Sequence, residues 1–240
     1  ETSFTNGNIY EWPTVNHDNQ RTGCYDCLCA EGHTDNNDGT CTATLTSSRG
    51  DGRVFTSTPP GANWDIAHDT TSGDPLDYDD STQIYSIYTR AREYGISRTF
   101  FPFDTSVIPD NANIISAKFL FRTVLIDNND NDGNDFITLV QTTQDSHDRL
   151  INEDYDQCGN IDNPREGGNR IDISALSRDR DYNFILNDNG MSWINKQGWT
   201  LLGIREGHDV LDEAPGNANS VSIRTSESEN PPKLIVTYEP

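Results

Sequence analysis

The chain has 240 residues and a formal net charge of −22, and only 32% of its residues are hydrophobic. So acidic a surface repels nucleic acid and anionic lipid and attracts cations, of which Ca²⁺ is the first cofactor to consider. No apolar run approaches the roughly 18 residues that a membrane-spanning helix needs, and the length suits a single β-sandwich domain over residues 1–240.

The N-terminal segment contains a strand-like stretch. The chain begins at Glu1 rather than at a methionine, which predicts a processed product that is secreted or displayed at the cell surface. Residues 1–12 then carry apolar side chains at Phe4, Ile9 and Tyr10. Because an extended segment can add a strand to the sheet edge of a neighbouring copy, we predict that residues 1–12 are an assembly strand.

Five cysteines predict disulfide bonds in an oxidising compartment. Most of them crowd into a polar loop insertion over residues 16–41, and the last lies in a second polar loop. The disulfide candidates are Cys24, Cys27, Cys29, Cys41 and Cys158. The spacing leaves their pairing open. A zinc site that includes His33 is the alternative, although the spacing lacks a second ligand pair.

Nine short β-branched or alternating runs predict strands, and turn-forming residues separate them. The runs are Gly7–Trp12, Thr42–Leu45, Gln83–Tyr88, Ile96–Phe103, Ile114–Ile126, Phe136–Gln141, Trp199–Arg205, Ser220–Arg224 and Lys233–Tyr238. The one predicted helical turn is Met191–Asn195. The pattern indicates an all-β sandwich with three long polar loops, at Asn16–Gly39, Gly61–Thr82 and Thr142–Arg170.

Four aromatic residues in polar segments are candidates for stacking on sugar rings. They are Trp12, Trp64, Tyr78 and Tyr155. The alternative for each is packing at the edge of the core, which tryptophan often does while its N–H finds a partner. The tripeptide Arg49-Gly50-Asp51 spells an adhesion motif, but we interpret it as an ordinary turn.

Three sequence blocks resemble a known family of domains. Arg98–Lys118 reads RTFFPFDTSVIPDNANIISAK, Leu186–Arg205 reads LNDNGMSWINKQGWTLLGIR, and the chain then closes with PPKLIVTY at Pro231–Tyr238. In this order and spacing they resemble the DNRLRE-type, carbohydrate-binding-module-like jelly rolls of secreted proteins. The resemblance covers about residues 84–240 and omits the cysteine-bearing loop. It implies a jelly-roll fold and a non-catalytic role.

The acidic run between two predicted strands resembles half of a calcium loop. Alternate oxygen side chains followed by Gly133 suit hard cations, but Leu139 stands where an EF-hand needs glutamate, so an EF-hand is excluded. The candidate ligands are Asp127, Asn128, Asp130, Asp132 and Asp135. The alternative is a solvated hairpin tip.

The five histidines are scattered and lie in no hydrolase or metalloprotease motif, and nothing in the spacing selects a pair of catalytic carboxylates. We therefore predict a protein that is not an enzyme. The first hypothesis is a structural subunit that self-associates into an extracellular fibre, appendage or surface layer. The alternative is a carbohydrate-binding module that binds polysaccharide.

Overall fold

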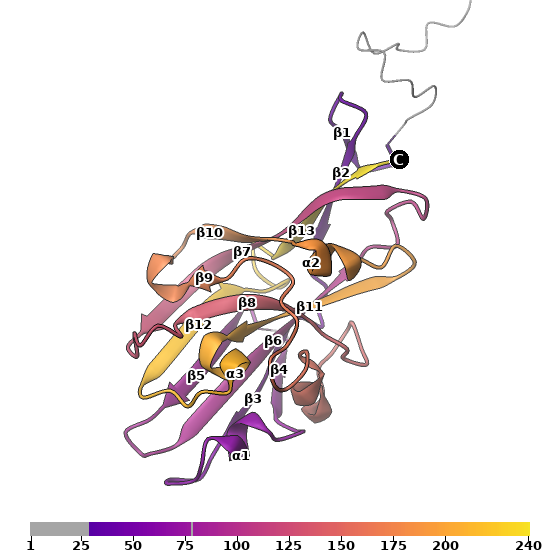
Figure 1. The fold of residues 1–240 in the computed structure, drawn as a ribbon. Helices are drawn as coiled ribbons and strands as arrows, with labels where there is room; N and C mark the ends of the chain where they lie inside the picture. Colours follow the sequence, from indigo (N-terminus) through magenta and orange to yellow (C-terminus); the bar gives the residue numbers. More distant parts are fainter. Residues whose placement is uncertain (1–28, 78) are drawn as a thin grey trace, which may run out of the picture.

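The computed structural model describes residues 29–77 and 79–240. The chain is mostly β, with 43% strand and 11% helix, and its strands form a large, curled antiparallel sheet (Figure 1). In the described residues, no helix is long and apolar enough to cross a membrane. The predicted all-β fold is confirmed.

The strands and helices are short apart from two long central strands. The strands are β1 (Thr34–Asp35), β2 (Cys41–Thr46), β3 (Gly52–Ser57), β4 (Asp74–Asp77), β5 (Ser81–Tyr88), β6 (Tyr94–Asp104), β7 (Asn113–Asn128), β8 (Phe136–Gln141), β9 (Ile171–Asp172), β10 (Asp181–Ile185), β11 (Trp199–Glu206), β12 (Ala218–Arg224) and β13 (Lys233–Glu239). The helices are α1 (Asp65–His68), α2 (Asp188–Ser192) and α3 (Gly207–Leu211), with 3₁₀ turns η1 (Asn152–Gln157) and η2 (Ile173–Ala175).

Eight of the strands follow the order of a jelly roll. In one layer β2 pairs with β13, β13 with β7 and β7 with β10. In the other layer β6 pairs with β11, β11 with β8 and β8 with β9. Each layer thus alternates early and late strands of the chain, as two Greek keys produce.

The core lies between these two layers. Phe119 on β7 meets Phe101 and Phe103 on β6 edge to face, with ring centroids 5.2 and 5.6 Å apart, and all three side chains are fully buried. Phe184 on β10 packs beside Phe119 at 6.2 Å. Aromatic contacts across the sandwich therefore compensate for the low hydrophobic content of the chain.

Strands β5 and β12 join the two layers into one continuous sheet. At one place along β6 two neighbouring strands of this sheet separate. β12 pairs with the C-terminal part of β7 and with β5, and β5 pairs with the start of β6. β3 occupies one edge of β6 over Gly95–Phe100. On the other edge of β6, β5 pairs only as far as Ser97, and β11 pairs only from Thr99 onward. These two strands therefore diverge at Arg98.

The structure corrects the predicted helical content. The helical turn begins at Asp188 rather than at Met191, because the Asn187 side chain caps the backbone N–H of Gly190. The short helices α1 and α3 were not predicted. Strands β3 and β10 were missed as well, since their short sequences lie among turn-forming and charged residues.

Asp51 is buried where the β2–β3 connection meets the segment after β12. Its carboxylate accepts hydrogen bonds from the Ser47 hydroxyl at 2.5 Å and from the Ser226 N–H at 2.8 Å, and its side chain is fully buried. An adhesion motif needs this carboxylate at the surface, so the interpretation of Arg49-Gly50-Asp51 as a turn agrees with the burial. Burial raises the pKa of Asp51 to about 7, although the hydrogen bonds from Ser47 and Ser226 lower it.

We expect Asp51→Asn to be more stable relative to wild type at pH 8 than it is at pH 4. A carboxyl group whose folded pKa lies above its unfolded value contributes stability that is present below about pH 4 and is lost as the pH rises through about 7. The amide cannot ionise, so the variant should gain up to about 4 kcal/mol on wild type over this interval, at about 1.4 kcal/mol per pKa unit. Urea unfolding of both proteins at the two pH values checks this. A difference in unfolding free energy that does not change with pH would contradict it.

Candidate functional site

The loop between β7 and β8, residues 129–135, is organised by the side chain of Asp135. Its Oδ1 accepts the backbone N–H of Asn131 at 2.7 Å and the side-chain amide of Asn219 at 2.8 Å, while its Oδ2 accepts the N–H of Gly133 at 2.9 Å. Asp135 is 6% exposed. Both of its oxygens are thus used to shape the loop from within.

Two other carboxylates of this loop converge on a histidine from α3. The Oδ2 atoms of Asp130 and Asp132 each lie 3.3 Å from Nε2 of His208. The side chain of His208 is fully buried, whereas that of Asp130 is 10% exposed and that of Asp132 is 46% exposed. The cluster therefore has a buried nitrogen donor and carboxylates that lead to solvent.

Glu206 holds the histidine ring from the opposite side. Its Oε1 lies 3.0 Å from Nδ1 of His208, its Oε2 accepts the backbone N–H of His208 at 2.9 Å, and its side chain is fully buried. Burial by itself would lower the pKa of His208, but the hydrogen bond and charge of Glu206, aided by Asp132, raise that pKa to about 9. The ring is thus fixed with Nε2 facing the loop.

The close approach of α3 to the loop depends on Gly207. A Cβ atom at this position would lie 1.9 Å from the carbonyl oxygen of Asn134 and 2.7 Å from the ring of Phe136. Only glycine leaves room for this contact. The helix can therefore place His208 directly beside the acidic loop.

The other side of α3 is anchored by a buried ionic centre. The carboxylate of Asp209 is bound by Arg98, with Nη2 at 2.7 Å from Oδ1, and by Arg205, with Nε at 2.6 Å from Oδ2. All three side chains are 1% exposed or less. Burial alone would raise the pKa of Asp209, but the two guanidinium groups hold it well below its usual range.

The remaining donors of this centre bind backbone carbonyls of three segments that surround it. Arg98 donates to the carbonyls of Tyr155 at 3.0 Å and His68 at 3.2 Å, and Arg205 donates to that of Asn160 at 2.7 Å. Each of these oxygens thereby acquires a charge-assisted partner. The centre thus fixes α1, η1 and the segment after η1 against the sheet.

The structure brings together two of the five predicted calcium ligands. Asp130 and Asp132 meet at His208, whereas Asp135 is used inside the loop. Asp127 is exposed and accepts a hydrogen bond from Asn129. The side-chain oxygen of Asn128 is buried and has no hydrogen-bond partner within residues 29–77 and 79–240.

Sequence reasoning missed His208 and Glu206. The available signal was the run Arg205–Asp209, which reads REGHD, begins with the last two residues of β11 and continues into α3 with no break. A charged run in that place suggests a solvated turn, but its five residues are all buried. Only the buried partners explain why charged side chains are tolerated there.

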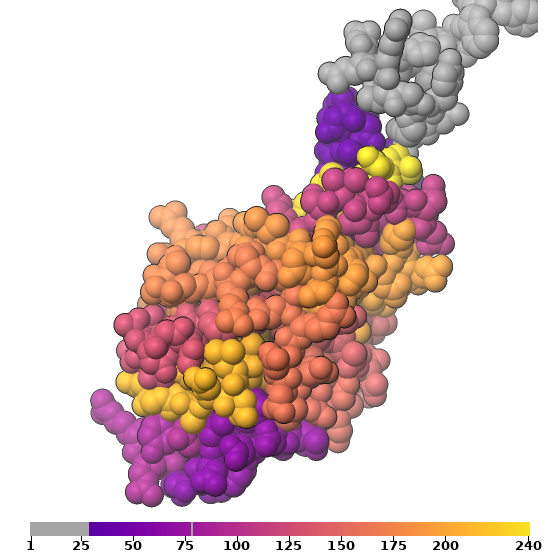
Figure 2. Space-filling model, in the orientation of Figure 1, coloured from indigo at the N-terminus to yellow at the C-terminus, as the bar shows by residue number. Residues whose placement is uncertain are grey.

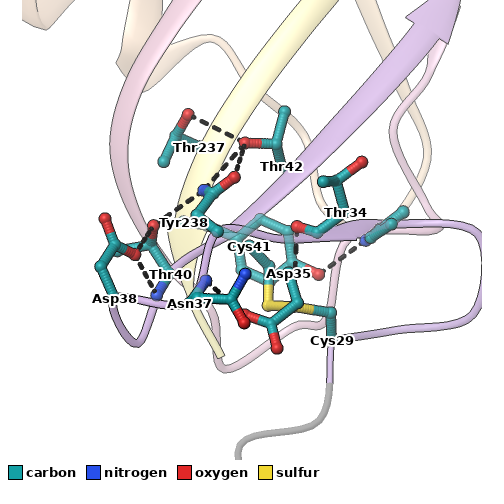
Figure 3. Close-up of a disulfide and its surroundings, with 12 residues drawn as sticks. Cys29, Thr34, Asp35, Asn37, Asp38, Thr40, Cys41, Thr42, Thr237 and Tyr238 are labelled. Atoms are coloured by element: carbon teal, nitrogen blue, oxygen red, sulfur yellow. Dashed lines mark hydrogen bonds between the residues drawn. A yellow bond between two sulfur atoms is a disulfide. The ribbon is translucent and has the colours of Figure 1, made fainter. Parts of the chain in front are cut away.

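One predicted disulfide is present in the described part of the chain. Cys29 and Cys41 are bonded and tie the start of this part to β2 (Figure 3). Cys158 was a disulfide candidate, but it is a buried free thiol, and burial raises its pKa to about 12. Cys24 and Cys27 lie outside the described residues, as do Phe4, Ile9 and Tyr10.

The predicted sugar-stacking residues are corrected where the structure describes them. Trp64 is 5% exposed, donates from Nε1 to Asp212 at 3.0 Å and stacks on His68. Tyr155 is fully buried beneath the guanidinium of Arg98. Both pack in the interior, so neither offers a ring face to a sugar. Trp12 and Tyr78 lie outside the described residues.

No protein-family model matches the sequence, and a search of curated proteins found no match. The resemblance to DNRLRE-type domains therefore stays a prediction.

We expect Asp209→Asn to destabilise the fold by about 3–5 kcal/mol, because removing the charge leaves two buried guanidinium groups without their counterion. Asp181→Asn is the matched control, since it breaks an ion pair with Arg122 at the surface. The Asp181 side chain is 59% exposed and that of Arg122 is 30% exposed. Its expected cost is below about 1 kcal/mol. Chemical unfolding of both variants gives the comparison, and equal losses would contradict the anchoring role of Asp209.

Proposed function

We propose that this chain is a non-catalytic subunit of an extracellular assembly, in which residues 1–12 of one copy pair with β2 of the next. The observation that carries the proposal is the outer edge of β2. β13 covers the inner edge over all six residues, whereas β1 covers the outer edge only at Cys41 and Thr42. The rest of this outer edge has no partner strand among the described residues.

The direction of the free backbone groups follows from the register. The N–H of Ser47 donates to the carbonyl of Pro232, so alternate residues from Ser47 back to Cys41 face β13. Thr44 and Thr46 therefore direct their N–H and C=O groups outward, and both are exposed. Such an edge is a template for one further strand.

Electrostatics favours pairing at this edge. The molecule carries a net charge of −22, but β2 (Cys41–Thr46) contains no charged residue. Residues 2–10 contain none either. Two uncharged strands can therefore pair where most other surfaces of two copies would repel each other.

The outer edge of β2 lies toward one end of the molecule. β1 and the end of β13 protrude from one end of the molecule, away from α1 and α3 at the other (Figures 1 and 2). The disulfide between Cys29 and Cys41 fixes the chain that leads from the N-terminal segment beside β2. A strand from another copy can reach this end without displacing the body of the sandwich.

Removing residues 1–12, or substituting Thr44→Pro, should convert an assembling protein into monomers. Proline removes an outward N–H and suits an edge position, so the fold itself should persist. Negative-stain microscopy and sedimentation in about 0.15 M salt, where repulsion is screened beyond about 8 Å, give the measurement. Circular dichroism confirms folding. A wild-type chain that stays monomeric, or variants that assemble as it does, would refute the proposal.

A second candidate function, polysaccharide binding, is favoured by one surface groove. The groove has a volume of about 250 Å³ and combines polar side chains with one indole. It is lined by Gln141, Thr143, Asp156, Gly159, Asn160, Arg165 and Trp193. Amide, carboxylate and guanidinium groups can pair with sugar hydroxyls.

If the groove binds polysaccharide, Arg165→Ala should weaken binding about tenfold, the loss expected for one charge-assisted hydrogen bond. Arg122→Ala is the control, because Arg122 lies on β7, outside the residues that line the groove. Titration calorimetry with soluble polysaccharides measures the effect. If wild type gives no heat with any of them, this second function is excluded.

A further inference from the structure

We propose that Asp130, Asp132 and His208 form a binding site for a divalent transition-metal ion of the zinc class. One ligand atom from each of the three residues lies within 4.8 Å of the others. The site joins the β7–β8 loop to α3, two segments about 75 residues apart in the sequence that the fold brings together. It is independent of the proposed strand addition at β2.

The spacing of the donors fits tetrahedral coordination. Zinc binds histidine nitrogen at about 2.0–2.1 Å and carboxylate oxygen at about 2.0–2.2 Å, which places neighbouring ligand atoms of a tetrahedron roughly 3.3 Å apart. Nε2 of His208 lies 3.3 Å from Oδ2 of Asp130 and 3.3 Å from Oδ2 of Asp132. An ion can therefore be held with little movement of these three atoms.

The buried Glu206 supports the metal site independently of the spacing of the donors. Zinc-binding histidines usually donate their other ring N–H to a carboxylate, which fixes the tautomer and the ring orientation. Oε1 of Glu206 lies 3.0 Å from Nδ1 of His208 and also accepts the Asn219 amide at 3.2 Å. Glu206 is thus a positioning residue that presents Nε2 to the two aspartates.

The donor set favours a transition metal over calcium. Calcium needs six to eight oxygen ligands at about 2.3–2.6 Å, and imidazole is a ligand for zinc, copper, iron and nickel. The neighbouring loop oxygens are already used, since Asp135 binds the loop backbone with both of its oxygens and Oδ1 of Asp132 accepts the N–H of Asn134 at 3.0 Å. Oδ2 of Asp130 also accepts the N–H of Gly216 at 2.8 Å, which leaves this carboxylate oxygen a second lone pair for an ion. Three protein donors are thus available, and the half-exposed Asp132 leaves the site open toward solvent.

The test uses the full chain, dialysed against a chelator and with its accessible thiols alkylated so that Cys24 and Cys27 cannot bind metal. Titration calorimetry with Zn²⁺ should show one equivalent bound. Asp132→Asn should weaken binding at least tenfold, because it removes the charge of one of the three ligands while an amide oxygen can still accept the N–H of Asn134. Asp127→Asn changes an exposed carboxylate of the same run outside the cluster, and it should leave the affinity unchanged.

Glu206→Gln should weaken zinc binding by about 10–100-fold, the usual effect of losing a partner of a metal-bound histidine. The absorption spectrum of bound Co²⁺ should show a tetrahedral nitrogen and oxygen environment in wild type and should be altered in this variant. Melting curves in chelator confirm that each variant is folded.

The proposal is overturned by any of three results. The first is that wild type binds no zinc at zinc concentrations up to the millimolar range, as would follow if the three side chains form only an ion pair. Zinc could bind equally well to Asp132→Asn, which would place the ion elsewhere. Calcium could bind in an Asp132-dependent way while zinc does not, which would assign the site to the other class of ion.

Discussion

The rest of the structure depends on the buried charge of Asp209. Two guanidinium groups, of Arg98 and Arg205, enclose this carboxylate at the place where β5 and β11 diverge on the edge of β6. A buried charge without partners costs several kcal/mol, so the opening in the sheet is stable only when all the donors are satisfied. The surplus donors bind carbonyls of the surrounding loops, including those of Tyr155 and Asn160. The polar loops are therefore held by an ionic centre where a more hydrophobic chain would use apolar burial.

The same short helix connects this centre to the acidic loop. Asp209 and His208 are adjacent, and they face opposite surroundings, the first the two arginines and the second Asp130 and Asp132. A helix of five residues has little stability of its own, so its position is set by the contacts at its ends. Because Asp209 is locked, His208 has a fixed place, and the cluster is preorganised rather than formed when a ligand arrives.

Alternation in the sequence was sufficient to predict the long strands but not the polar interior. In β7, Phe119 and Phe121 recur at every second position, and that period identifies a half-buried strand without further information. β10 was missed, because Phe184 is its only fully buried residue and the apolar Ile185 beside it is exposed, so the strand shows no alternating pattern. Burial of Arg98, Arg205 and Asp209 is invisible to periodicity, since each charge is acceptable only through a partner distant in sequence. The acidic loop could be recognised from its local pattern, whereas its partner His208 is distant in sequence and could not.

The acidic loop and the free strand edge lie at different ends of the molecule (Figure 1), and this separation has a physical consequence for assembly. The strand pairing proposed at β2 would be short and would involve exposed backbone, so its contribution in water would be modest. Such pairing requires a protomer that does not deform when neighbours pull on it. The ionic centre around Asp209 and the contacts of α3 stiffen the opposite half of the sandwich without occupying β2. If the proposed pairing at β2 occurs, stability and association can therefore be changed separately, because the Asp209 centre and the outer edge of β2 lie in different parts of the described chain.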